Sequence, residues 1–314
     1  MLLILLISTF ILMMVISPTV ALTATLNGAK LFFFNVFPAL FMFSILCNLI
    51  VSLGGIELYS KLFGGMLCKP LRLSRKCATA IIISILCGYP LGTKYSGDLY
   101  RNGDINFKTF KRLVILASTP SPIFVIGSIG VLMLKNVTLG YILLISSYIS
   151  AFILSFILKT DKSRNIINVN NISREKLPFS KCFLNSVEQS ISTVLMVGGF
   201  IIFFNVLCTF LDNLVFSKLH FSLVGGILAG ILEMTNGCKI ISTSAIPMQF
   251  IISIIAFFLT FGGLSILSQC YSFIYDLKIS FLYFVKYKIL FGVINSVVAF
   301  AIYNLFTYIT ACTF

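Results

Sequence analysis

The sequence has very little charge and almost no histidine. Only 10% of its 314 residues are charged and one is histidine, whereas 59% are hydrophobic and the mean hydropathy is +1.06. A soluble chain of this length could not cover so apolar a surface with polar groups. We therefore expect an integral membrane protein whose outer surface faces lipid.

The same scarcity excludes several kinds of site. With His220 as the single histidine and nine scattered cysteines that form no C-x-x-C, we expect free thiols, no metal site and no cofactor. No Ser/His/Asp set, carboxylate pair or phosphate-loop glycine pattern occurs, so we do not expect an enzyme. The net charge of +14 could suggest nucleic acid. However, the basic residues lie in short loops beside apolar segments, and membrane topology explains them better.

Long apolar runs are what the sequence does have. The runs 2–22, 31–53, 137–158 and 289–309 each extend over about 20 residues, the length that a helix needs to cross the hydrocarbon core. The first run has no basic residues before it and no small-residue cleavage site after it. We therefore predict a retained N-terminal transmembrane helix over residues 1–22, not a signal peptide.

The basic residues are concentrated in four loops. Residues 54–76, 98–112, 159–182 and 276–288 together hold 18 of the 23 Lys and Arg, which predicts that these loops and the N-terminus are cytoplasmic.

This orientation constrains the path of the chain in a multi-pass protein of the cell membrane. Segment 77–100 must start and finish on the cytoplasmic side, and segment 221–245 must start and finish outside. Both are therefore predicted to be re-entrant hairpins, entering from opposite faces.

The predicted fold is an all-α inverted repeat, the plan of many secondary transporters. Each repeat has a spanning helix, a re-entrant hairpin, a broken helix and a final helix. The first repeat covers 23–159, with hairpin 77–100, broken helix 110–134 and helix 137–158; after a cytoplasmic linker at 160–182, the second covers 183–314, with hairpin 221–245, broken helix 247–275 and helix 281–311.

The predicted breaks repeat at matching positions. The hairpin tip at 87–94 matches 232–239, and a second break follows roughly 30 residues later in each half, at 118–122 and 261–265. Irregular backbone at membrane depth is tolerated only when it is buried in protein or lines a watery cavity. We therefore expect these four breaks to form a solute site.

The chemistry at the breaks favours an anion. Half-helix N-termini carry partial positive charge, and Lys94 and Lys239 follow the two tips. Alternatively, each lysine extends to its nearer interface or neutralises Glu233, which could itself carry a coupling proton or cation.

Small polar residues at the breaks could bind solute or only pack helices. The predicted substrate-binding residues are Gly88, Tyr89, Pro90, Gly92, Lys94, Thr119, Ser121, Glu233, Thr235, Asn236, Gly237, Lys239, Gly263, Ser265 and Gln269.

Four segments, 35–41, 87–94, 230–237 and 261–269, carry a family resemblance. The sequence resembles the family of sporulation integral membrane protein YlbJ, also called stage V sporulation protein V, within the nucleoside-recognition Gate group. The resemblance implies an architecture similar to concentrative nucleoside transporters, in which two opposed hairpins and two unwound helices form the solute site. It also implies transport of dipicolinate across the outer forespore membrane during endospore formation. Thr93 and the histidine-free stretch 264–267 depart from the pattern that we associate with this family.

Three functions follow as hypotheses. The first is a transporter of a small anionic solute, with dipicolinate as the implied substrate. The second is a transporter or channel for a neutral, nucleoside-like solute, in which the lysines are structural. The third is a non-transporting assembly factor of the spore envelope that recruits a partner through the basic surface at 54–76. A homodimer is a further candidate assembly, because pseudo-symmetric folds often dimerise.

Overall fold

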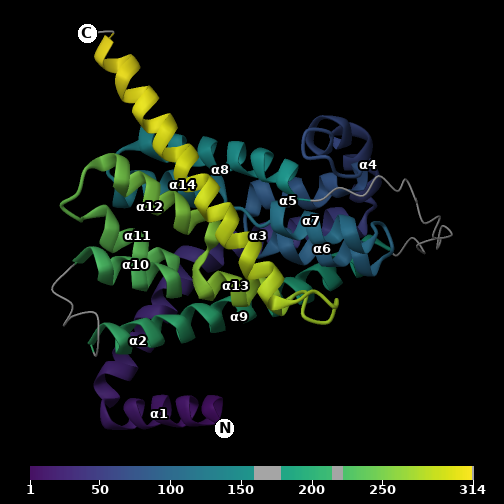
Figure 1. The fold of residues 1–314 in the computed structure, drawn as a ribbon. Helices are drawn as coiled ribbons and strands as arrows, with labels where there is room; N and C mark the ends of the chain where they lie inside the picture. The colour runs from purple at the N-terminus through teal and green to yellow at the C-terminus, as the bar shows by residue number, and fades with distance from the viewer. Residues whose placement is uncertain (159–177, 214–221, 313–314) are drawn as a thin grey trace.

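The computed structural model describes residues 1–158, 178–213 and 222–312, and these residues fold entirely into helices and their connections (Figure 1). Four helical stretches within them are long and apolar enough to cross a membrane, or up to six if each of two sharply bent helix pairs counts as one span. The protein is therefore a multi-pass integral membrane protein. The four are α8 (Val137–Ile157), α9 (Phe179–Leu211), the stretch Met248–Ser272 and α14 (Phe281–Cys312).

The N-terminal region differs from the single helix predicted over 1–22. Helix α1 (Leu2–Ile16) ends at Ser17, and α2 (Pro18–Leu31) begins there after a bend of 102°. Proline lacks a backbone N–H and suits the first position of a helix, which explains why the break falls before Pro18. The prediction of a cytoplasmic N-terminus relied on one straight span over residues 1–22. Because α1 turns away from α2 (Figure 1), these helices do not form that span, and the prediction loses this support.

Residues 23–27, which lie between the apolar runs 2–22 and 31–53, are helical, and two of their polar side chains are satisfied within the helix. The hydroxyl of Thr23 donates to the carbonyl of Thr19 at 2.7 Å, and that of Thr25 donates to the carbonyl of Ala21 at 2.8 Å. Helix α2 then continues through a wider turn, η1 (Phe32–Val36), into α3 (Phe37–Ser52).

After α3 the chain turns sharply at Gly54. Its φ of +88° is in the left-handed region, where glycine carries no steric penalty, and the next helix bends away by 89°. Three short elements follow before the first hairpin: α4 (Gly55–Leu62), η2 (Gly64–Cys68) and η3 (Arg75–Cys77).

Two pairs of short helices occupy the predicted hairpins. In the first, α5 (Ala78–Cys87) packs on α6 (Leu91–Arg101); in the second, α10 (Ser222–Leu232) packs on α11 (Met234–Ser242). The second pair approaches very closely, since a Cβ added at Gly237 would lie 2.2 Å from the Cα of Gly230.

Two further interruptions of helical structure fall within the segments predicted as broken helices, 110–134 and 247–275. Helix α7 (Phe107–Leu116) is separated from η4 (Ile123–Met133) by a segment that contains two prolines. Helix α12 (Met248–Phe261) is separated from α13 (Gly263–Ser272) at Gly262, whose φ is +90°. In each case the break falls where proline or glycine interrupts an apolar run.

The long helices surround these elements. Helix α14 crosses the front of the bundle in Figure 1 and packs on α8 and α12, while α9 packs on α2 and α3. Helix α9 begins at Phe179, so the end of the predicted linker at 160–182 is helical; residues 159–177 lie outside the described residues.

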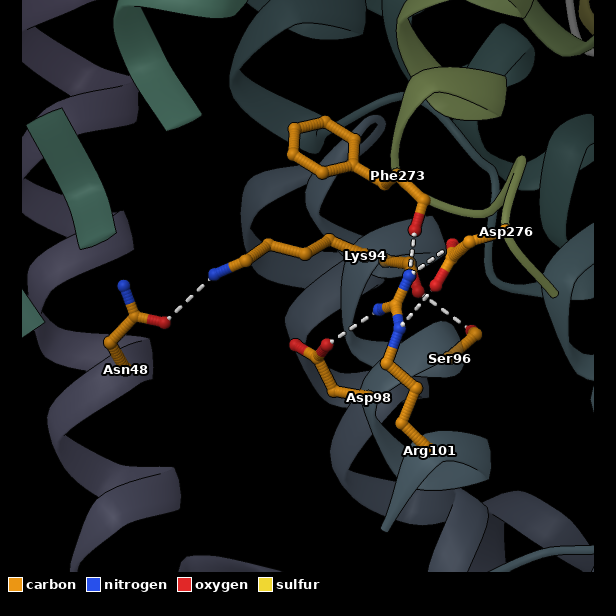
Figure 2. A network of polar contacts seen from close by, with 8 residues as sticks. Asn48, Lys94, Ser96, Asp98, Arg101, Phe273 and Asp276 are labelled. Atoms are coloured by element: carbon orange, nitrogen blue, oxygen red, sulfur yellow. Dashed lines mark hydrogen bonds and ion pairs between the residues drawn. The ribbon is translucent and has the colours of Figure 1, made fainter. Parts of the chain in front are cut away.

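Two ion pairs join three of the four basic loops. Lys76 pairs with Asp104 at 3.0 Å, and Arg101 pairs with Asp276 at 2.7 Å (Figure 2). The Arg101 guanidinium also lowers the pKa of the Asp276 carboxyl. Loops 54–76, 98–112 and 276–288 therefore lie at one end of the molecule.

The close approach within the second hairpin predicts a stability difference between two glycines. We expect Gly237→Ala to lower the free energy of unfolding by about 1–3 kcal/mol, because its methyl group would overlap α10. Thermal unfolding of the purified protein in detergent measures this.

The control is Gly199→Ala, on α9, where an added Cβ would have no neighbour within 4 Å. Alanine is the better helix former, so this variant should be at least as stable as the wild type. Equal unfolding temperatures for both variants would contradict the packing described for α10 and α11.

Candidate functional site

Each hairpin tip docks on the break of the helix that follows it. In the first half, the backbone N–H of Tyr89 donates to the carbonyl of Thr119 at 2.9 Å. In the second half, the space beside Gly263 is filled by the backbone of the second tip, with the Met234 nitrogen 3.1 Å from the position of an added Cβ. Both breaks are thus covered by protein.

The two tips also meet each other. The hydroxyl of Tyr89 donates to the sulfur of Met234 at 2.9 Å and lies 3.3 Å from the carbonyl oxygen of Leu259. This contact joins residues 145 positions apart in the sequence.

A cavity of about 410 Å³ lies at this meeting point. That volume suits a small organic solute, and its mostly apolar wall with a few polar groups is typical of such sites. Both tips, both broken helices and parts of α2, α3 and α9 contribute. The polar and charged lining residues are Asn27, Tyr89, Ser121, Ser128, Asn205, Glu233, Thr235, Asn236, Lys239, Ser265 and Gln269.

The structure brings many of the predicted site residues together at the cavity, but not all of them. Those that line it are Tyr89, Pro90, Ser121, Glu233, Thr235, Asn236, Lys239, Ser265 and Gln269. Those that do not are Gly88, Gly92, Lys94, Thr119, Gly237 and Gly263.

Lys94 is the clearest difference from expectation. Its ammonium group donates to the Asn48 side-chain oxygen on α3 at 3.1 Å, as Figure 2 shows, and lies 5.0 Å from the centre of the Tyr95 ring. Asn48 in turn donates to Ser190 on α9 at 2.9 Å. Lys94 therefore ties the first hairpin to two long helices and does not share the cavity with Lys239.

The remaining predicted residues outside the cavity serve packing. A Cβ at Gly92 would lie 1.9 Å from the carbonyl oxygen of Ala117, and one at Gly88 would lie 2.6 Å from the nitrogen of Ser121. Thr119 is buried, and its hydroxyl pairs with that of Ser84 at 2.9 Å. These contacts hold the first tip against the first break.

Glu233 caps a helix. Its two carboxylate oxygens accept hydrogen bonds from the backbone nitrogens of Thr235 at 3.1 Å and Asn236 at 2.8 Å, at the start of α11. A carboxylate at a helix N-terminus satisfies free N–H groups and interacts favourably with the helix dipole. The Glu233 charge is therefore balanced by α11, while Lys239 at the other end of α11 has an exposed side chain.

Two amides in the cavity wall were not predicted. Asn27 lies on α2, and Asn205 lies on α9, where its amide nitrogen donates to the carbonyl of Ala24 at 2.8 Å. Asn205 is an isolated amide in an apolar stretch, and that is the sequence signal that could have identified it, whereas Asn27 lies among polar residues and carries no such signal. Their helices are remote from the tips in sequence, which is why the break pattern did not include them.

Several helices start at the cavity. The first residue of η4, Ile123, lines it, as does Ser265 in the first turn of α13. The first residues of a helix have free N–H groups that point along its axis and attract anions. Of these starts, that of α11 is already capped by Glu233.

One known protein is similar to the chain over most of its length. Sporulation integral membrane protein YlbJ of Bacillus subtilis (strain 168) is 25% identical over 313 residues, which cover 89% of this chain and 77% of YlbJ. No family model matches the chain. No solved structure matches it either. The alignment covers most of both chains, and it supports distant membership of the chain in the YlbJ family of sporulation integral membrane proteins.

Proposed function

We propose that the protein is a transporter that binds a small anionic solute in the cavity between the two hairpin tips. The observation that carries this proposal is the contact of Tyr89 with Met234 beside a cavity of about 410 Å³. Tips that meet at a solute site can admit solute from one side when one tip moves and from the other side when its counterpart moves.

The proposed membrane arrangement is an inverted repeat with two re-entrant hairpins. Support comes from the order of elements: each hairpin precedes the broken helix on which its tip docks, and a long apolar helix follows. The ion pairs of Lys76 with Asp104 and Arg101 with Asp276 hold three basic loops at one end. We assign that end to the cytoplasm because Lys and Arg are enriched in cytoplasmic loops.

The anionic character of the solute is argued from Lys239 and the helix starts. Glu233 is balanced by two backbone N–H groups, so Lys239 is the cavity charge that a solute can neutralise. The N-termini of η4 and α13 add further donors.

For the solute itself we propose dipicolinate, which the family resemblance implies. It is a flat dianion, and its ring suits the apolar walls provided by residues such as Phe43 and Phe124. The name of YlbJ connects that relative with sporulation. We extend this role to the present chain and propose delivery of the solute across the outer forespore membrane.

The amides in the wall favour a second candidate, a neutral nucleoside-like solute. Asn27, Asn205, Asn236 and Gln269 offer paired donors and acceptors that suit a base or a sugar. Competition between uridine and dipicolinate separates the two candidates.

The different positions of the two lysines predict different effects of their removal. In proteoliposomes that take up dipicolinate, Lys239→Met should raise KM about tenfold, equivalent to about 1.4 kcal/mol of lost binding. Lys94→Met should leave KM near the wild-type value and lower the free energy of unfolding by about 0.5–1.5 kcal/mol, because it removes the bond to Asn48.

Uptake kinetics and thermal unfolding of both variants measure these effects. Unchanged KM in Lys239→Met would reject its role in binding the anion. Uptake of uridine by vesicles that do not take up dipicolinate would favour the neutral solute.

The capping geometry predicts that Glu233 is required for structure more than for coupling. Glu233→Ala should lower the free energy of unfolding by about 0.5–2 kcal/mol, the usual cost of losing a cap. Glu233→Gln keeps a side-chain oxygen for the α11 N–H groups, so it should retain most of the stability and uptake. A Glu233→Gln protein of wild-type stability that no longer transports would instead assign the carboxylate to coupling.

A further inference from the structure

A lysine that the transport proposal does not use lies in the interior of the protein. Lys288 is on α14, in a span-length apolar helix, and its side chain has 0% of its surface exposed. Its ammonium nitrogen lies 2.6 Å from the carbonyl oxygen of Ser118, to which it donates a hydrogen bond. Ser118 belongs to the break after α7, so Lys288 reaches from one half of the chain into the first break.

Aromatic rings and a thiol surround the ammonium group of Lys288. Its nitrogen lies 5.9 Å from the centre of the Tyr89 ring and 5.3 Å from that of Phe291. The titratable groups that face it are Tyr89, from the first tip, and Cys270, from α13. Among the residues that the structure describes, no carboxylate forms an ion pair with Lys288.

A buried ammonium without a carboxylate partner is costly, and a lysine in this situation readily exchanges its proton. Its location is also informative, because the carbonyls at the end of a half-helix carry partial negative charge and coordinate cations in transporters with broken helices. Ser118 comes two residues after the last residue of α7, Leu116. The ammonium group of Lys288 therefore occupies, just beyond the C-terminal end of α7, the kind of position in which such transporters bind a cation.

We propose that Lys288 is a proton-binding site that controls the first hairpin tip and so couples transport to the movement of protons. The protonated amine holds the Ser118 carbonyl and faces the Tyr89 ring. Loss of the proton, which passes to water on the side to which the site is open, leaves a neutral amine with a weaker hold on both. No other reactant is required.

The first tip would respond because it is fixed to the same break. Tyr89 donates its N–H to Thr119, the residue after Ser118, and its hydroxyl reaches Met234 in the second tip. A change at Ser118 therefore acts on the first tip through the hydrogen bond between Tyr89 and Thr119. It acts on the contact between the tips through the ring of Tyr89. The coupling part of this inference rests on the proposed transport function, whereas proton binding does not.

The first test needs no solute. The natural chain has no tryptophan, so Leu86→Trp places a single tryptophan, whose emission can be excited selectively, on an exposed position just before the first tip. We expect its emission, measured in detergent from about pH 5 to about pH 11 around the ordinary lysine range, to show a one-proton transition. That transition should disappear when Lys288→Met or Lys288→Arg is added, since methionine cannot be protonated and arginine stays charged.

The matched control is Lys286→Met, which removes an exposed lysine two residues away on the same helix. It should leave the transition unchanged. At least one of the two Lys288 variants must have the wild-type elution volume and unfolding temperature. This requirement excludes misfolding as the reason for a lost transition. A transition that persists in a folded Lys288 variant overturns the proposal.

The second test uses proteoliposomes with dipicolinate as the probe and a pH gradient of one unit. If one proton accompanies the solute, the wild type should accumulate dipicolinate about tenfold. Lys288→Met should only equilibrate it, while dipicolinate exchange at equal pH continues. Gradient-driven accumulation by Lys288→Met overturns coupling through this residue. Wild-type vesicles that transport nothing reject the proposed function instead, and the fluorescence titration then decides proton binding alone.

Discussion

The backbone N–H and carbonyl groups at the helix breaks must be hydrogen-bonded or covered inside this lipid-facing protein, and the rest of the structure depends on that constraint. An unpaired N–H or carbonyl costs several kcal/mol in hydrocarbon, so a chain with breaks in its apolar helices must cover each break with protein. Here the covering elements are the hairpin tips: the backbone of Tyr89 pairs with Thr119, and the second tip fills the space beside Gly263. The breaks and the tips thus require each other, and the cavity forms where both pairs meet.

The same constraint explains why glycine recurs at these places. The carbonyl oxygen of Ala117 is 1.9 Å from where a Cβ would stand on Gly92, and the Cα of Gly230 is 2.2 Å from where one would stand on Gly237. Backbones at this distance leave no room for a side chain. Gly92 and Gly237 were predicted as solute contacts because they lie at the breaks. In the structure they allow neighbouring backbones to pack closely. A glycine-rich break in a sequence therefore indicates where a site lies better than it indicates which residues contact the solute.

Local patterns predicted much of this fold and only part of the site. Prolines at 120 and 122 and the glycine pair at 262 and 263 interrupt apolar runs, so both broken helices could be read from the sequence. The bend at Ser17 also has a proline after it, Pro18, but it was placed inside one predicted helix, because Thr23 and Thr25 resemble a loop yet bond within the helix. Side-chain direction was the other limit. Lys94 and Lys239 occupy matching positions, but only the three-dimensional packing of Asn48 beside α6 decides that Lys94 turns away from the cavity.

The charged groups near the tips show how helix ends replace ion pairs in this interior. Glu233 is held by two N–H groups at the start of α11, and Lys288 by a carbonyl at the end of α7, so each charge meets a backbone dipole of opposite sign. A dipole is a weaker partner than a full charge and does not fix the protonation state of the side chain as firmly. Lys288 has a single such bond and Glu233 has two, and Lys288 is the more deeply buried. Of the two, Lys288 is therefore the group whose protonation state the fold fixes less firmly, and it faces the Tyr89 ring of the first tip.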